Sequence, residues 1–157
     1  MTPGAPSSSS GELRLLHLLW VVFMLIIGVY AVLPFLIAGE GLDLLPAGAR
    51  PGLFFAALGA AVASFAARRW WSNSLLAAAA SAAGGEMKTD LWVRLRAGCL
   101  ISWALGEVVA ILGCAYAILG QRPVDGLPWS AGALLLLYLH RPAAWPVQAL
   151  AGRAVPA

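Results

Sequence analysis

Residues 91–120 read LWVRLRAGCLISWALGEVVAILGCAYAILG, and this stretch decides the fold class of the chain. Between Arg96 and Arg122 its only charged residue is Glu107. A run of this length is sufficient to cross a bilayer, since about 20 apolar residues span the hydrocarbon core. A carboxyl group at that depth costs roughly 2.5–3.5 kcal/mol to insert. We therefore expect a transmembrane helix in which Glu107 is protonated, has a partner or has a function.

The composition of the whole chain extends this prediction. Of its 157 residues, 61% are hydrophobic and only 11% are charged, whereas a soluble domain has about 25% charged residues. The pattern predicts an all-α integral membrane bundle of four transmembrane helices, at about residues 13–38, 51–67, 91–119 and 127–140. The fourth segment is short, so that it either crosses a thinned bilayer or enters and leaves on the same side.

The remaining segments give the domain organisation. Residues 1–11, MTPGAPSSSSG, are rich in Pro, Ser and Gly and predict a disordered tail. Residues 12–141 form the transmembrane domain, whose first span we interpret as an uncleaved anchor because it is longer than the apolar part of a signal peptide. Residues 142–157 form a C-terminal cytoplasmic tail. Residues 75–83, LLAAAASAA, are either an interfacial helix or a helical extension of the second span.

Charge predicts the orientation of the bundle. With an even number of spans, both termini share one side with eight of the ten basic residues. Because basic residues favour the cytoplasmic side, we expect both termini in the cytoplasm of a bacterium, with the protein in its inner (plasma) membrane. Tryptophans near helix ends are typical of an aromatic belt. The residues predicted to contact lipid or a partner at this inner face are Arg68, Arg69, Trp70, Trp71, Arg94 and Arg96.

Small residues predict how the helices pack. Lipid tails give no hydrophobic drive for helix association, so close approach of backbones matters. Small residues surround most of the second span, which favours a central position for it. We expect it to pack against the third span with Glu107 at or near the seam, while the first and fourth spans face lipid or a partner protein. The predicted packing residues are Gly59, Ala63, Gly106, Ala110 and Gly113.

Three interpretations of Glu107 stay open. It exchanges a proton or cation within the membrane, since burial favours a titrating carboxyl group there. It is instead permanently protonated and hydrogen-bonds across the helix seam, or its partner belongs to another subunit. Tyr30 and Tyr138 supply polar groups near opposite membrane faces, and we do not expect either at the depth of Glu107.

Other candidate residues predict no chemistry. Cys99 and Cys114 lie too far apart on one helix to pair or to share a metal, so we interpret them as small core residues. His17 and His140 lie near inner helix ends, where interfacial capping is favoured over haem or metal binding. The sequence has no phosphate-binding loop, no HExxH and no Ser/His/Asp set. We expect no catalytic residues, no metal, no cofactor and no nucleic-acid partner.

Residues 52–115 resemble part of a known family. The stretch ALGAAVA at 57–63 is similar to the alternating-glycine helix of rotary ATPase proteolipid (c-ring) subunits, in which a basic loop and a helix with one midplane carboxylate follow. The resemblance implies that Glu107 carries an ion and that Arg68 and Arg69 face the soluble rotor. This chain differs in its longer inner loop and its two additional spans.

A second resemblance concerns LGEVVAILG at 105–113 and the closing Leu-His-Arg-Pro, which are similar to uncharacterised small bacterial four-span membrane proteins. That class implies no specific activity. We therefore expect a non-enzymatic accessory or structural subunit of a bacterial inner-membrane complex, or a homo-oligomer. Its partners are the lipid bilayer and other membrane subunits or further copies of itself. The alternative is a proton- or cation-handling protein that uses Glu107.

Overall fold

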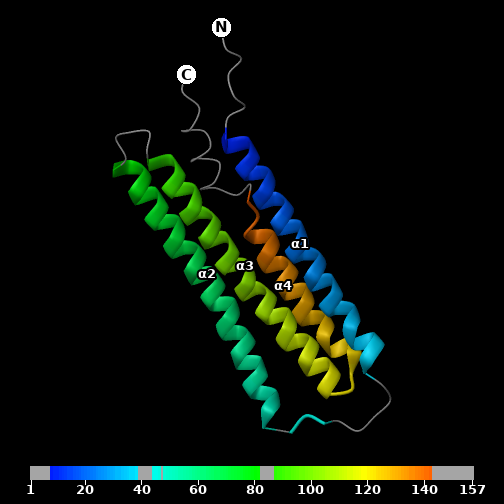
Figure 1. The fold of residues 1–157 in the computed structure, drawn as a ribbon. Coiled ribbons are helices and arrows are strands. Elements are labelled where there is room, and N and C mark those ends of the chain that lie inside the picture. Colours follow the sequence, from blue (N-terminus) through cyan, green and yellow to red (C-terminus); the bar gives the residue numbers. More distant parts are fainter. Residues whose placement is uncertain (1–7, 39–43, 47, 82–86, 143–157) are drawn as a thin grey trace.

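The computed structural model describes residues 8–38, 44–46, 48–81 and 87–142. They form four α-helices, α1 (Ser8–Ile37), α2 (Ala49–Ser81), α3 (Met87–Leu119) and α4 (Leu127–Leu139), with a short 3₁₀ helix η1 (Pro123–Gly126) before α4. No strand occurs in the described ranges, which confirms the all-α fold class. Figure 1 shows the helices side by side, with the start of α1 and the end of α4 at one end of the bundle.

Within the described residues, three helical segments are long and apolar enough to cross a membrane: Leu13–Ile37, Ala49–Leu75 and Val93–Leu119. The outward faces agree with this, because large apolar side chains such as Leu25, Leu36 and Phe55 are two-thirds or more exposed. Contiguous apolar surface of this kind is rare on soluble monomers. The three segments therefore indicate a membrane protein.

The fourth predicted span is the shortest helix of the bundle. The bounds of α4 agree with the prediction, but its 13 residues extend only about 20 Å at 1.5 Å per residue. The preceding η1 adds four residues, which brings the combined length to about 27 Å. This is slightly less than the roughly 30 Å of a hydrocarbon core, so α4 is not among the segments long enough to cross.

Two predicted boundaries differ from the structure. α2 continues without a break to Ser81, so of the two interpretations of residues 75–83 the helical extension is right as far as the structure describes them. Alanine and leucine are strong helix formers, which explains why the helix runs on. α1 begins at Ser8, inside the predicted disordered tail. Residues 1–7, 82–86 and 143–157, and thus most of both predicted tails, lie outside the described residues.

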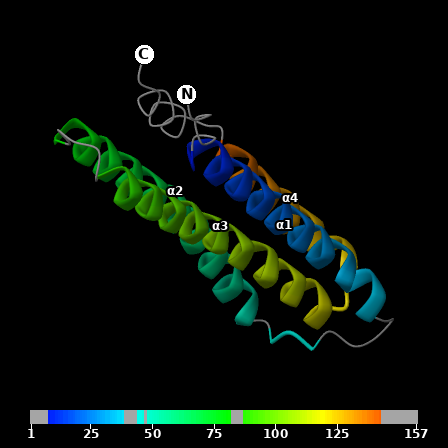
Figure 2. The same cartoon turned by 45° about the horizontal axis from the view of Figure 1, so that its top comes forward.

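The centre of the bundle is α3. It packs against α2, α1, η1 and α4, whereas α2 packs mainly on α3; half of the apolar stretch of α3 is buried, against 11% of that of α2. Figure 2 shows α2 beside α3, and α1 beside α4. The predicted contact between the second and third spans is confirmed. The predicted central position of the second span is wrong. The first and fourth spans, which were expected to face lipid or a partner protein, also pack on α3 and on each other.

Glycines on α3 explain why this helix accepts neighbours on several sides. A Cβ atom at Gly98 would lie 2.6 Å from Cγ of Trp71 on α2, and one at Gly106 would lie 2.9 Å from Cδ1 of Leu137 on α4. Contacts this short are essentially never seen, so a Cβ at Gly98 would force the Trp71 ring to move, whereas at Gly106 the terminal methyl of Leu137 would have to shift. Each glycine thus admits a bulky side chain from a different helix.

The turn after α3 determines the direction of α4. Gln121 has φ 53°, the left-handed conformation that ends many helices. The N–H of Arg122 donates to the carbonyl of Ala117 at 3.0 Å, and the N–H of Gln121 donates to that of Ile118 at 3.2 Å. These two bonds form a Schellman motif, and the helix-incompatible Pro123 follows. The chain therefore reverses here and α4 returns antiparallel to α3.

Candidate functional site

Glu107 lies on the side of α3 that faces α1. The hydroxyl of Tyr30 donates a hydrogen bond of 3.3 Å to Oε1 of Glu107, and both side chains are partly buried. The neighbouring Gly106 contacts α4 through Leu137. The carboxyl group is thus on the contact between α1 and α3, and its predicted position at the seam of α2 and α3 is wrong.

The expectation that neither tyrosine reaches the depth of Glu107 is also wrong, because Tyr30 does. Counting along the helices explains the pairing. Tyr30 is 17 residues from Leu13 and Glu107 is 14 residues from Val93, the two ends of their apolar stretches on the same side of the bundle. At 1.5 Å per residue these depths differ by about 5 Å, which a tyrosine side chain can bridge. Counting residues along the two helices is therefore the way in which the sequence points to Tyr30 as the partner of Glu107.

A second polar site lies deeper in the bundle and nearer the end that holds the start of α1. The hydroxyl of Ser64 on α2 is 2.9 Å from the carbonyl oxygen of Ser102 on α3 and 3.2 Å from Nδ1 of His140, directly after α4. All three residues are almost completely buried. Sequence reasoning did not join them, because they come from three different segments and His140 was interpreted as an interfacial cap.

The hydrogen bonds of Ser64 define the tautomer of His140. A carbonyl oxygen only accepts, so the single hydroxyl hydrogen of Ser64 goes to Ser102. Nδ1 of His140 must then carry a proton and donate it to the Ser64 oxygen. In the neutral imidazole Nε2 is consequently unprotonated, and it is buried without a hydrogen-bond partner in the part of the chain described.

The backbone of His140 is held as firmly as its ring. Its carbonyl accepts a 3.0 Å hydrogen bond from the indole N–H of Trp103, which is itself fully buried. The imidazole meets the ring of Phe65 edge-on, with centroids 5.2 Å apart. These contacts join the end of α4 to both α2 and α3.

Arg68 continues the polar site one turn along α2. Its Nη1 donates to Sγ of Cys99 at 3.3 Å, and its Nη2 is buried without a partner among the described residues. We call Ser64, Arg68, Cys99, Ser102 and His140 the polar cluster. Within the described residues it combines an unpartnered guanidinium nitrogen, a donor, with an unpartnered imidazole nitrogen, an acceptor, so it can hold a small hydrogen-bonding molecule.

The predicted packing residues fall into two groups. Gly106, Ala110 and Gly113 are buried on α3, as a packing role requires. Gly59 and Ala63 are exposed on α2, and no atom lies within 4 Å of the position of a Cβ at Gly59. The two α2 residues therefore do not pack against other helices in the described part of the chain.

The predicted inner-face residues gather at one end of the bundle. Arg68, Arg69, Trp70 and Trp71 belong to the second half of α2, and Arg94 and Arg96 belong to the first turns of α3. The rings of Trp70 and Trp71 pack edge to face, with centroids 4.8 Å apart. Only Arg68 is part of the polar cluster.

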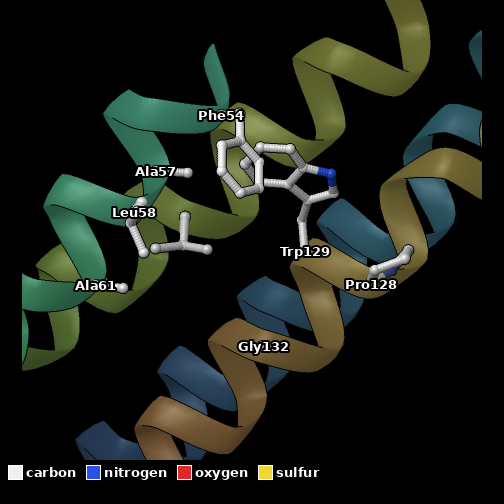
Figure 3. Close-up of a pocket in the computed structure, with 8 residues that line it drawn as sticks. Phe54, Ala57, Leu58, Ala61, Pro128, Trp129 and Gly132 are labelled. Atoms are coloured by element: carbon white, nitrogen blue, oxygen red, sulfur yellow. The ribbon is translucent and has the colours of Figure 1, made fainter. Parts of the chain in front are cut away.

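An apolar groove separates α2 from α4. Its volume is about 320 Å³, and Val109 of α3 lies at its base. Figure 3 shows Trp129 reaching from α4 toward Phe54 of α2, and the two rings meet edge-on with centroids 6.1 Å apart. The lining residues are Phe54, Ala57, Leu58, Ala61, Val109, Pro128, Trp129 and Gly132.

The thiols and histidines are not brought together into a metal site. Cys99 and Cys114 are free and buried, which confirms them as core residues. His17 is exposed, and its ring nitrogen Nδ1 donates to the carbonyl of Leu13 in the same helix, at 2.9 Å. His17 and His140 therefore have separate surroundings. No group of three or more His, Cys, Asp or Glu residues lies together in the described ranges.

Comparison with known proteins adds no relative. The chain matches no protein-family model, no curated protein and no solved structure.

Proposed function

We propose that this chain is a non-enzymatic subunit of a bacterial inner-membrane assembly, built with other membrane subunits or with further copies of itself. The proposal further assigns the outward face of α2 as the contact surface. This outward face consists of Gly52, Ala56, Gly59 and Ala63. All four are exposed, and open space surrounds the positions of a Cβ at Gly52 and Gly59.

The observation that carries the proposal is the direction in which these small residues point. Small residues with a spacing of three or four permit close approach of membrane helices, and packing is the main source of helix association in lipid. On α3, Gly106, Ala110 and Gly113 are covered by the chain's own helices. On α2, Ala57 and Ala60 are likewise buried, but the four residues of the outward face point away from the bundle, where a helix of another subunit can pack closely against them.

The attachment of α2 supports the same conclusion. α2 packs mainly on α3, and its contact with α4 is slight. Its 27-residue apolar stretch is only 11% buried. A long helix that packs on its own chain along one side leaves its other side available to a partner.

Native purification from the source membrane in a mild detergent, followed by mass spectrometry, tests the proposal. We expect the chain to elute with other membrane subunits or as a homo-oligomer. The variant Gly59→Leu should shift it to the monomer, because the added side chain holds the neighbouring helix away. Gly28→Leu is the matched control, since Gly28 on α1 also has open space around it. A wild-type chain that purifies alone as a monomer contradicts the proposal.

The pairing of Glu107 favours a second candidate function, the handling of a proton or cation. Its hydrogen-bond partner is the neutral hydroxyl of Tyr30, and no ion pair with Glu107 is seen in the described part of the chain. Ionisable residues within membrane spans mark ion pathways.

Flux measurements in proteoliposomes test this second function. Glu107→Gln keeps the size and hydrogen bonding of the side chain but removes its titration, so it should abolish proton flux. Tyr30→Phe keeps the carboxyl group and should alter the rate without abolishing it. Unchanged flux in Glu107→Gln excludes the second function and leaves the hydrogen bond as a structural contact.

A further inference from the structure

A cavity lies between α2 and α3 at the basic end of the bundle. Its volume is about 270 Å³, and its walls are Trp70, Trp71, Ser74 and Leu75 of α2 with Arg94 of α3. It is separate from the polar cluster, with which it shares no residue.

The polar and aromatic walls of the cavity are ordered along the bundle axis. Trp71 packs over Gly98, so these two residues are at the same level. The end of α2 and the start of α3 lie at the same end of the bundle (Figure 1). Arg94 is therefore one turn nearer that end than Gly98, and Ser74 is almost one turn nearer than Trp71. The polar groups form the rim and the indoles lie beneath them.

This order matches the profile of a membrane interface. Tryptophan favours the boundary between headgroups and hydrocarbon, and basic residues favour the headgroup layer. Trp70 is 63% exposed, so its indole face borders the space in which lipid chains lie. A molecule in the cavity would meet charge at one end and apolar surface at the other.

The guanidinium at the rim fits a phosphate group. Arg94 presents several N–H groups in a planar fork that matches phosphate oxygens. The hydroxyl of Ser74 gives its single hydrogen to the carbonyl of Trp70 at 2.9 Å, so the donor to a phosphate at this rim is Arg94.

The surrounding charge favours an anion. Among the residues whose side chains the structure describes, six basic residues lie at this end, and the described side chains of the opposite end include two, Arg50 and Arg122. The six are Arg14, Arg68, Arg69, Arg94, Arg96 and Arg141.

We propose that this cavity binds an anionic phospholipid, with its phosphate held by the guanidinium of Arg94 and an acyl chain along the exposed Trp70. A free phosphate ion would leave the indole surface uncovered. Basic pockets between membrane helices are known to suit acidic headgroups. This proposal takes the chain as a membrane protein and does not depend on the association of α2 with a partner.

Retention of lipid by the purified full chain tests the proposal. Delipidated protein is mixed with equal amounts of phosphatidylglycerol and phosphatidylcholine in detergent, and native mass spectrometry counts the lipids that remain bound. We expect the wild type to retain one phosphatidylglycerol in preference to phosphatidylcholine. Arg94→Gln should lose about fivefold in that preference, from a contribution of about 1 kcal/mol per basic residue.

Two further variants distinguish lipid binding in the cavity from a general effect of positive charge. Arg122→Gln removes one exposed positive charge at the opposite end and should leave the preference unchanged. Ser74→Leu fills the cavity without changing charge and should reduce retention as Arg94→Gln does. Circular dichroism and the midpoint of thermal unfolding establish that each variant is folded. Equal losses in Arg94→Gln and Arg122→Gln, or no loss in either cavity variant, overturn the proposal.

A competition experiment distinguishes a site for a phospholipid from a site for a free anion. Inorganic phosphate at millimolar concentration should not displace the bound phosphatidylglycerol, because it lacks the chain that covers Trp70. Displacement at that concentration would reduce the site to a phosphate site and overturn the lipid assignment. Gly59→Leu should retain the lipid, so failure of the proposed α2 contact and failure of this site are distinguished.

Discussion

α2 and α3 have the same length, and both carry glycines, but they use them differently. The glycines of α3 lie under side chains from α2 and α4, so that close contact replaces the missing Cβ atoms. Gly52 and Gly59 on α2 lie under nothing. The difference teaches that spacing of small residues predicts a face that can pack closely, but not whether the partner belongs to the same chain.

Among substitutions that test this difference, the largest loss of stability is expected at Gly113 of α3. A Cβ there would collide with the side chain of Trp129, whose Cγ lies 2.6 Å away. Gly113→Leu should therefore destabilise the bundle by about 3 kcal/mol or more, as overpacking of a tight contact does. Thermal unfolding in detergent, followed by tryptophan fluorescence, measures the loss. Gly28→Leu on α1 is the control and should unfold near the wild-type midpoint.

A single methyl group tests the contact of α3 with α2. In Gly98→Ala the new Cβ lies 2.6 Å from Cγ of Trp71, so the indole must move, at a cost of about 2 kcal/mol. The same unfolding assay gives the value. Equal stability of Gly98→Ala and the wild type would show that Trp71 moves freely and would weaken the distinction between the two helices.

The covered side of α2 should behave like α3. Ser64→Ala removes the acceptor of His140 Nδ1 and the donor to the Ser102 carbonyl, which should cost about 1 kcal/mol or slightly more. Ser72→Ala is the matched change, because the hydroxyl of Ser72 bonds only within α2, to the carbonyl of Arg68. If Ser72→Ala costs as much, the effect belongs to the helix and not to the polar cluster.

The smallest effect is expected on the outward face of α2. Gly59→Ala adds a methyl group to open space, so the stability of the monomer should change by less than about 0.5 kcal/mol. Unfolding in a detergent that separates the chain from its partners measures this. A loss near that of Gly98→Ala would mean that the outward face is covered within the monomer and would remove the basis for the α2 contact.

Several features of the fold were readable from the sequence. The apolar run around Glu107 predicts a spanning helix, and the bounds of α3 and α4 lie within a few residues of the expected ones. The contact between α2 and α3 was expected from small residues and is present, although Gly59 and Ala63, the α2 residues predicted for it, point outward. The central place of α3 did not follow, because it depends on which side of each helix its glycines occupy relative to neighbours that lie far along the chain.

The candidate sites were less predictable than the helices. Glu107 stands out because it is a lone carboxyl group, but its partner Tyr30 emerges only when depth is counted along both helices. The polar cluster had no sequence signal of its own. Ser64, Ser102 and His140 are ordinary residues in separate segments, and only the antiparallel return of α4 places His140 beside α2.

The fastening of His140 has a mechanical consequence. Its carbonyl is held by Trp103 of α3 and its ring by Ser64 of α2, so the last turn of α4 cannot slide along the bundle like a piston. Tension on the backbone just beyond Pro142 would be shared at once by α2 and α3. The shortest α-helix, α4, is therefore joined at its C-terminal end to both α2 and α3.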